Sequence, residues 1–162
     1  MIARRMVKAL SRLTDPVLVS GEGITFLVYH RVGGGSSSEV DLAVDDFRSQ
    51  VEYLAEHFDV MSIDDAVREL HTRTLPATTR QQVVITVDDG TADFTEHLVP
   101  ALVEANVPVV LYAATHFIDT ATGFPWGPPP TSWAALRDAM TTGLVTVGSH
   151  SHSHWLMDRT DA

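Results

Sequence analysis

Apolar residues in this chain follow two alternating patterns, short continuous runs and longer stretches with helical spacing. The runs are rich in β-branched residues, as in strands that are buried on both faces of a sheet. They fall at residues 24–29, 83–87, 107–113 and 144–147, with a further short strand expected at 58–61. Stretches with helical spacing separate most of these runs. The pattern therefore predicts βαβ units that build a parallel sheet.

Two helices are expected between the first strand and the central one. The earlier helix follows a glycine- and serine-rich loop at residues 33–38, and Asp45 or Asp46 is its expected N-cap. The later helix begins at Ser62, with Asp65 in a variant of the capping box. Their inward faces are predicted to be Phe47, Val51, Leu54 and Phe58 in the first helix, and Ile63, Val67 and Leu70 in the second.

Helical spacing returns on both sides of the run at 107–113. The stretch at 94–105 contains Pro100, which is expected to kink the helix or to divide it into two pieces. The next helix is capped by Ser132 and ends at Gly143. The two earlier helices, which begin near Asp45 and at Ser62, are interpreted as packing elements that carry no chemistry.

Composition narrows the class of protein. The 162 residues suit one domain, yet a complete (β/α) barrel typically needs about 250 residues. A formal charge of −10, from 21 acidic and 11 basic residues, argues against nucleic acid as a partner, because nucleic-acid binding depends on Lys and Arg contacts to phosphate. The chain has no cysteine, so any metal ion must be bound by oxygen and imidazole ligands.

The N-terminal residues 1–23 are predicted to form a helical extension. Apolar and basic residues alternate at helical spacing over residues 2–13, which suits a helix packed on the domain or one that contacts a membrane surface or a partner. The segment lacks the apolar core of a secretory signal, and no stretch approaches the length of a membrane span. A cytoplasmic location is the resulting expectation.

Candidate ligands follow two of the predicted strands. Asp88 and Asp89 end the central strand, and His150, His152 and His154 follow the last one. Two adjacent acids at a strand end are costly to bury without a compensating cation or hydrogen-bond donors. Because the carboxyl ends of parallel strands share one edge of a sheet, the acids and the histidines are expected to meet there. A divalent metal ion would then compensate the carboxylates.

Two motifs resemble those of the NodB-type polysaccharide deacetylases, carbohydrate esterase family 4. TVDDG at residues 86–90 resembles the family's first motif, and HSHSH at 150–154 resembles its second. The flanking sequences LVYHRV at 27–32, ATHFID at 114–119 and SWAALRDAM to GLVTVGSH at 132–150 are also similar to the bacterial branch. The resemblance implies an α/β fold over residues 24–162, an incomplete, distorted (β/α) barrel whose parallel strands alternate with helices.

The resemblance also implies an activity, the metal-dependent removal of N- or O-acetyl groups from a carbohydrate or polysaccharide. By the family's pattern, Asp89, His150 and His154 bind the metal, Asp88 is the catalytic base, and His152 stays outside the ligand set. Zn²⁺ is the expected metal, and Co²⁺, Ni²⁺ or Mn²⁺ could replace it. A metal with three protein ligands leaves a position open for water and lowers the pKa of that water from about 16 to about 7.

The sequence departs from the family's pattern after His154. The chain ends eight residues later, and the Arg-Pro-Tyr-like motif, the Asp/Trp segment and the Leu-x-His motif that supplies the general acid are absent. We therefore expect a truncated deacetylase domain with impaired activity, either a fragment or a decayed copy. The alternatives are a non-catalytic remnant that binds metal or sugar, and a structural domain in which HSHSH is only a loop.

Three further residues have two interpretations each. His30 ends the first strand, so it could line the site and even replace the missing acid, or it could be merely exposed. Phe124 and Trp126, in the proline-rich loop at 123–130, could form an aromatic wall against a sugar, or could hold the loop together.

Overall fold

The computed structural model describes residues 23–36, 38–72 and 80–155. The extension predicted for residues 1–23 therefore lies, apart from Gly23, outside the described residues. Four parallel strands form the sheet, in the order β1-β5-β6-β7, and a short fifth strand, β4, pairs with the beginning of β5. Their bounds are β1 Ile24–Tyr29, β4 Asp59–Val60, β5 Gln82–Asp89, β6 Val109–Ala113 and β7 Val145–Ser149.

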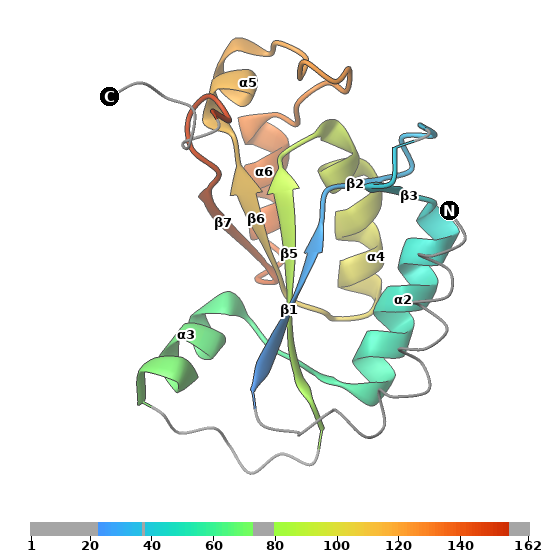
Figure 1. The fold of residues 1–162 in the computed structure, drawn as a ribbon, viewed down its shortest axis with the longest axis vertical. Helices are drawn as coiled ribbons and strands as arrows, with labels where there is room; N and C mark the ends of the chain where they lie inside the picture. Colours follow the sequence, from blue (N-terminus) through green and yellow to red (C-terminus); the bar gives the residue numbers. More distant parts are fainter. Residues whose placement is uncertain (1–22, 37, 73–79, 156–162) are drawn as a thin grey trace, which may run out of the picture.

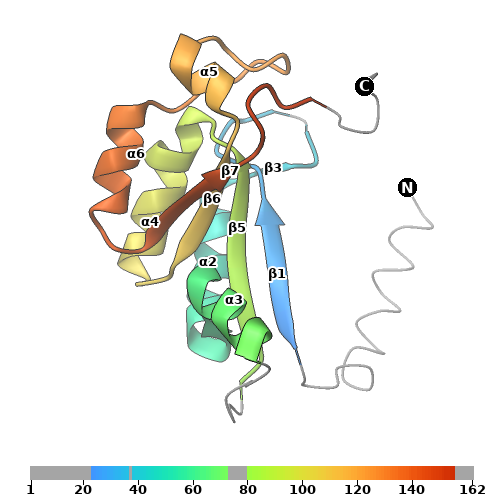
Figure 2. The same cartoon turned by 90° about the vertical axis from the view of Figure 1, so that its left-hand side faces the viewer.

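Helices cover one face of this sheet along its length (Figure 1, Figure 2). These are α2 (Val44–His57), the π-helical turn η1 (Phe94–Leu98) with α4 (Val99–Glu104), and α6 (Trp133–Met140). Their apolar residues form one core with the inward side chains of β5 and β6. On the opposite face, α3 (Ile63–Thr72) packs against the beginning of β5. Alternating helices and parallel strands confirm the predicted fold class.

The two helix starts differ from one another. Ala43 occupies the N-cap of α2 and makes no side-chain bond there, so the predicted cap by Asp45 or Asp46 is wrong. Both acids lie in the first turn instead, where the helix dipole favours negative charge. At α3 the prediction is confirmed, because the Asp65 N–H donates to Ser62 Oγ at 3.1 Å.

The predicted inward face of α3 is confirmed at Ile63, which packs against the cluster of Met61, Ala66 and Val84, but it is wrong at the other two positions. Val67 and Leu70 are exposed, and the residue of α3 that is buried is Ala66. The reason is the position of the helix: α3 covers only the beginning of β5, where Ala66 contacts Val84 and Met61. The spacing of apolar residues correctly identified an amphipathic helix. How much of its apolar face is buried depends on how far the neighbouring strand β5 extends beside it.

Pro100 divides its helix, as predicted. It lies in the first turn of α4, directly after the π-helical turn η1, where a missing backbone N–H costs little. Two elements were not predicted, helix α5 (Thr115–Thr120) and the two-stranded sheet of β2 (Arg31–Val32) with β3 (Asp41–Leu42). Both are too short to leave a periodic apolar pattern.

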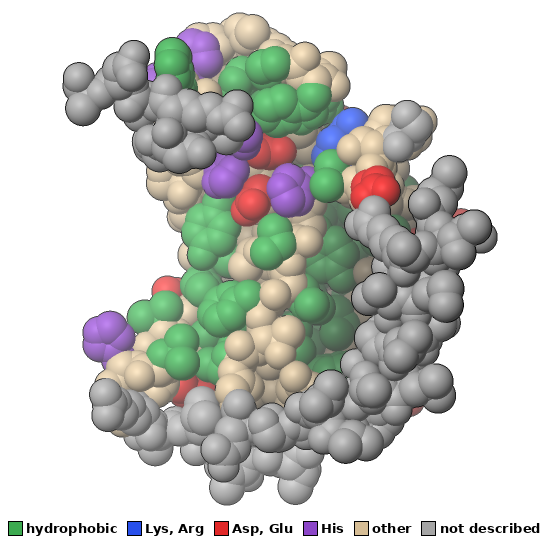
Figure 3. All heavy atoms as spheres, viewed as in Figure 1, with side chains coloured by type: hydrophobic (Ala, Val, Ile, Leu, Met, Phe, Trp, Pro, Cys, Tyr) green, Lys and Arg blue, Asp and Glu red, His purple; other side chains and the backbone are tan. Residues whose placement is uncertain are grey.

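The face of the sheet opposite the main helices exposes apolar side chains. Phe26 and Val28 on β1 are 43% and 57% exposed, while the alternating Leu27 and Tyr29 pack against the core. Figure 3 shows apolar side chains along the hollow on this face of the molecule, below a cluster of acidic and histidine side chains. Among the described residues, none of the helices has the length and apolar character needed to span a membrane.

Candidate metal centre

The central strand β5 positions the two acids. Hydrogen-bonded neighbours flank it on both sides, with β1 on one and β4 and β6 on the other. At its end Asp89 has a φ of 77° and Gly90 a φ of 91°, so the chain turns sharply after the strand. The Asp89 carbonyl accepts from the Ala114 N–H and the Gly90 carbonyl from the Thr131 N–H, both at 2.9 Å. These bonds hold the turn, and Asp89 is only 3% exposed.

The edge strand β7 positions the histidines. The His150 N–H continues the β6–β7 pairing by donating to the Ala113 carbonyl at 2.9 Å. The chain then turns, because Ser151 and His154 adopt left-handed conformations with φ of 62° and 54°. A bond from the His154 N–H to Ser151 Oγ at 3.1 Å closes this turn. It brings the imidazole of His154 back over that of His150, with ring centroids 4.8 Å apart.

The acid and the two imidazoles converge. Asp89 Oδ1 lies 3.1 Å from His154 Nε2 and 3.6 Å from His150 Nε2. One ligand atom from each of the three residues falls within 4.8 Å of the others. Tetrahedral coordination with bonds of about 2.0–2.1 Å would place ligand atoms about 3.3–3.4 Å apart. The two distances from Asp89 Oδ1 are close to this value, so the structure brings the three predicted ligands together as one group that could hold an ion.

The Asp89 carboxylate has the character of a metal ligand. Its Oδ1 atom is buried and accepts no hydrogen bond. Burial raises the pKa of Asp89, although the charges that His154, His30 and His150 can carry act in the opposite direction. A buried carboxylate oxygen without a donor is unfavourable. A divalent cation at this position would remove that cost, so the donor set fits the metal that the sequence implied.

Asp88 and His30 lie beside the cluster of three. His30 Nε2 is 3.8 Å from Asp88 Oδ2, which places His30 at the site rather than on a remote surface. Its role as a substitute acid stays a prediction. His152 lies outside the cluster: its Nδ1 is 2.9 Å from Thr115 Oγ1, and its carbonyl accepts from the His116 N–H.

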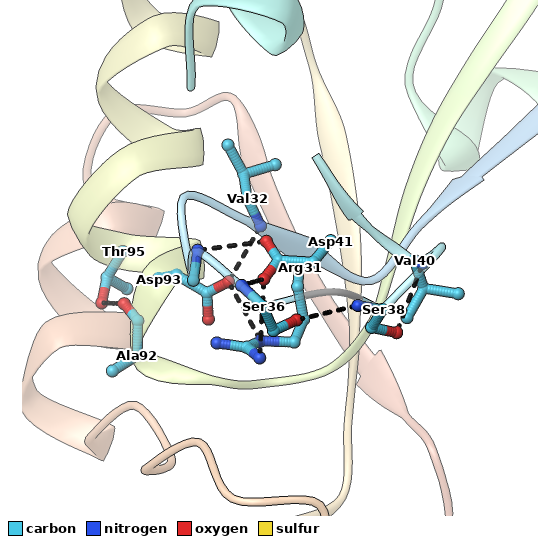
Figure 4. A network of polar contacts seen from close by, with 10 residues as sticks. Arg31, Val32, Ser36, Ser38, Val40, Asp41, Ala92, Asp93 and Thr95 are labelled. Carbon is cyan, nitrogen blue, oxygen red and sulfur yellow. Dashed lines mark hydrogen bonds and ion pairs between the residues drawn. The ribbon is translucent and has the colours of Figure 1, made fainter. Parts of the chain in front are cut away.

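A polar network that the sequence did not reveal holds the loop after β1 (Figure 4). The guanidinium group of Arg31 lies 3.6 Å from Asp93 Oδ2 and 3.8 Å from Asp41 Oδ2. Asp93 Oδ2 also accepts from the Val32 N–H at 2.9 Å, and Asp41 accepts from the Gly34 and Ser36 N–H groups. The only sequence signal was the arginine that directly follows His30 at the end of β1.

The pKa of Asp41 reflects this network. Burial of the Asp41 carboxyl acts to raise its pKa, but the hydrogen bonds from Ser36 and Gly34 and the charge of Arg31 together lower it below its ordinary value. The ionised form is therefore favoured in the folded protein. The loop after β1 is tied down by a charged side chain and by its own backbone.

A pocket of about 470 Å³ opens between this loop and the metal centre. Its lining includes His30, Arg31, Val40, Asp89, Trp126 and His154. The two aromatic residues of the proline-rich loop differ in role: Phe124 is 3% exposed and packs on Phe117, whereas Trp126 is 45% exposed and lines the pocket. Of the two interpretations, Phe124 holds the loop together and Trp126 is available as a wall.

Comparison with known proteins agrees with the motifs. The family model described as polysaccharide deacetylase matches residues 75–161, more than half of the chain and including both motifs. No curated protein matches the chain.

Several solved structures share the fold. IcaB from Ammonifex degensii is 26% identical with a TM-score of 0.72, and the match covers 82% of this chain and 54% of that one. The Streptococcus pyogenes deacetylase PplD is 18% identical with a TM-score of 0.75, covering 88% and 62%. The BpsB deacetylase domain from Bordetella bronchiseptica is 22% identical with a TM-score of 0.60, covering 83% and 57%.

The chain thus spans little more than half the length of these structures. The matched residues include the strand end that carries Asp89 and the turn that carries His150 and His154. The family model and these similarities of fold lead to one conclusion: the chain belongs to the polysaccharide deacetylase family.

Proposed function

We propose that the protein is a metal-dependent hydrolase that removes N- or O-acetyl groups from a carbohydrate. Asp89, His150 and His154 are the proposed metal ligands. The observation that carries the proposal is the buried Asp89 Oδ1, which accepts no hydrogen bond and lies 3.1 and 3.6 Å from the two imidazole nitrogens. Membership of the deacetylase family supports the same class of reaction. The acetate bound in the solved PplD structure corresponds to the product expected here.

Asp88 is the proposed base. It follows the same strand as Asp89, but its carboxylate lies next to His30 and not in the cluster of three. Asp88 is therefore free to accept a proton from an attacking water while Asp89 binds the metal. A bound divalent cation would polarise the acetyl carbonyl and lower the pKa of water. The positive φ of Asp89 is a conformation that costs about 1–3 kcal/mol, which the rest of the fold must offset.

Zn²⁺ is the proposed metal. One carboxylate and two imidazoles without sulfur form a set that Zn²⁺ accepts, with an open position left for catalysis. Co²⁺, Ni²⁺ and Mn²⁺ could occupy the same ligands, and their relative affinities would follow their general order for nitrogen and oxygen sites.

We also propose that the 162-residue polypeptide, by itself, releases acetate slowly or only binds. Two observations support this: the chain covers little more than half of the solved structures that it matches, and Phe26 and Val28 lie exposed below the site. Within the described residues, moreover, His30 is the only ion-pair partner of Asp88. A metal- or sugar-binding protein without turnover is thus the second candidate.

The test combines metal analysis with product analysis. The purified chain is loaded with Zn²⁺ or Co²⁺, dialysed, and incubated with N-acetylated and O-acetylated oligosaccharides while free acetate is measured. Deacetylation predicts one ion per chain and acetate release that Asp88→Asn abolishes without loss of the ion. Stoichiometric metal without acetate supports the metal-binding protein, and absence of stoichiometric metal contradicts both the hydrolase and the metal-binding protein. His152→Gln serves as the control, since His152 lies outside the cluster.

A further inference from the structure

Trp126 lies beside the metal centre because its loop is tied to the strand end that carries Asp89. The Ala92 N–H donates to the Pro129 carbonyl, and the Thr131 N–H donates to the Gly90 carbonyl, both at 2.9 Å. Within the loop, the Phe124 N–H donates a hydrogen bond to the Pro128 carbonyl, also at 2.9 Å. The loop after α5 and the turn after β5 therefore form one unit, which fixes Trp126 relative to the site.

Ring contacts with Phe124 and His154 hold the indole of Trp126. The Phe124 ring lies 5.0 Å away at an interplanar angle of 32°, and Phe124 in turn stacks on Phe117 at 4.3 Å. The imidazole of His154 also lies 5.0 Å from the indole, at an interplanar angle of 59°. An indole held in this way loses little conformational entropy when a ligand binds.

Holding the loop together does not explain the exposure of Trp126. Phe124 already does so, since it is 3% exposed and forms a buried cluster with Phe117 and Ala114. Trp126 is 45% exposed and lines the pocket that also contains Asp89 and His154. An exposed aromatic ring in a pocket with a few polar groups is typical of a ligand site.

We propose that Trp126 is a stacking platform for a sugar ring of the substrate, next to the metal centre. The C–H groups on one face of a pyranose are weakly positive, and the face of an indole is negative, so the two attract in addition to their burial of apolar surface. Arg31 and His30 line the same pocket and supply donors for hydroxyl or carbonyl oxygens. The platform rests on the proposed function for the identity of its ligand, but its contribution can be measured without turnover.

The experiment measures binding of the β-1,4-linked trimer of N-acetylglucosamine to the metal-loaded chain by calorimetry. Trp126→Ala is expected to weaken binding about tenfold, while Trp126→Phe, which keeps an aromatic face, retains most of the affinity. Tyr53→Ala is the matched control, because Tyr53 is a similarly exposed aromatic residue on α2 and lies outside this pocket. It should leave the affinity unchanged. Thermal unfolding and Zn²⁺ stoichiometry verify that each variant is folded and keeps its ion.

The outcomes separate the platform from the reaction. Binding of the trimer that depends on Trp126, with no acetate released, supports the platform and favours the binding protein without turnover over the hydrolase. Acetate release with the same KM in the unmodified chain and in Trp126→Ala contradicts the platform and leaves the hydrolase intact. The platform is also overturned if the trimer binds the unmodified chain and Trp126→Ala with equal affinity, or if it does not bind the unmodified chain.

Discussion

Asp89 is the last residue of β5, the central strand of the sheet, whereas His150 and His154 follow β7, a strand at its edge. On the acidic side, β5 has paired neighbours on both sides, and the turn at Gly90 is bonded to two other segments. On the imidazole side, β7 pairs with β6 alone, and the turn depends on a few bonds such as that from the His154 N–H to Ser151 Oγ. The acid is thus fixed by the core of the sheet. The histidines follow its edge strand, and their segment is held by the end of β6 and by α5, through the bonds from the His150 N–H to the Ala113 carbonyl and from the His116 N–H to the His152 carbonyl.

This difference indicates that the metal-free site is less stable than it could be, and that this cost favours binding of a cation. The core buries a carboxylate oxygen that has no donor, which is unfavourable until a cation binds. The histidines can shift by the small distance that coordination requires, because they are partly exposed and lie at the sheet edge. Metal binding should therefore raise the free energy of unfolding. This gain should exceed the contribution that the contacts of the histidine side chains make in the metal-free protein.

The largest effect is expected for Asp89→Asn. A neutral amide should lower Zn²⁺ affinity by more than the factor of about 10–100 that is typical for partners of metal ligands. The pKa of Asp89 is raised in the folded protein, so ionised Asp89 costs stability above that pKa, and the cost disappears as the pH falls through it. The substitution removes this cost, and the metal-free variant should be at least as stable as the unmodified chain at pH 7.

Calorimetric titration of Zn²⁺ and thermal unfolding with and without the ion check both parts. The contrast between the acidic and the imidazole side of the site is contradicted if the asparagine variant binds Zn²⁺ as tightly as the unmodified chain. It also fails if the metal-free variant is clearly less stable, because the buried acid would then have a structural role.

His150→Gln and His154→Gln test the imidazole half. Each should weaken Zn²⁺ binding by about 10–100-fold or more, while the metal-free unfolding free energy changes by less than about 0.5 kcal/mol, since both side chains are partly exposed. His152→Gln should leave the affinity within a few-fold, because His152 contacts Thr115. Equal losses in all three variants would show that the tract binds metal without a defined geometry.

Asp41→Asn tests the loop network that borders the pocket. The Asp41 side chain is 2% exposed and accepts two backbone hydrogen bonds near Arg31, so the substitution should cost about 1.5–3 kcal/mol at pH 7. Because the pKa of Asp41 is lowered by folding, its contribution is present above the ordinary pKa of 3.8 and is lost as the pH falls through the folded value.

Urea unfolding at pH 7 and at pH 3 measures this contribution. The difference between Asp41→Asn and the unmodified chain should shrink at the lower pH. Asp45→Asn, on the first turn of α2, is the control with a small effect. A difference that is the same at both pH values would contradict a role for the ionised carboxylate.

Gly148→Ala probes the edge strand with a smaller effect. A Cβ at Gly148 would lie 2.8 and 2.9 Å from ring atoms of Tyr112, its partner across β6 and β7. The collision should cost about 1–2 kcal/mol in unfolding free energy. Gly148→Ala should cost less unfolding free energy when it is added to Tyr112→Ala than when it is made in the unmodified chain, because the colliding ring is then absent. An unchanged stability in Gly148→Ala would show that this edge is looser than the structure indicates.

The site could be predicted from the sequence because its two halves follow continuous apolar strands. The β-branched runs before Asp89 and before His150 identify strand ends, and parallel strands place those ends at one edge. Phe124 and Trp126 could not be assigned in this way. Both lie in one loop, and only their packing shows that the first is buried and the second lines a pocket.

The remaining surprises depend on contacts that are remote in the sequence. Arg31 and Asp93 are 62 positions apart, and an acid that pairs with a given arginine leaves no periodic signal. The outward direction of Val67 and Leu70 depends on how little of the sheet α3 covers. Local patterns therefore specified the elements, whereas their extent of burial required the assembled fold.

A crystal structure of the Zn²⁺-loaded chain, with anomalous scattering recorded at the zinc edge, would decide whether the two halves bind one ion. We predict a single strong peak at full occupancy, about 2.0–2.2 Å from a carboxylate oxygen of Asp89 and from Nε2 of His150 and His154. A peak coordinated by other residues, or none near Asp89 in a well-ordered site, would contradict this prediction.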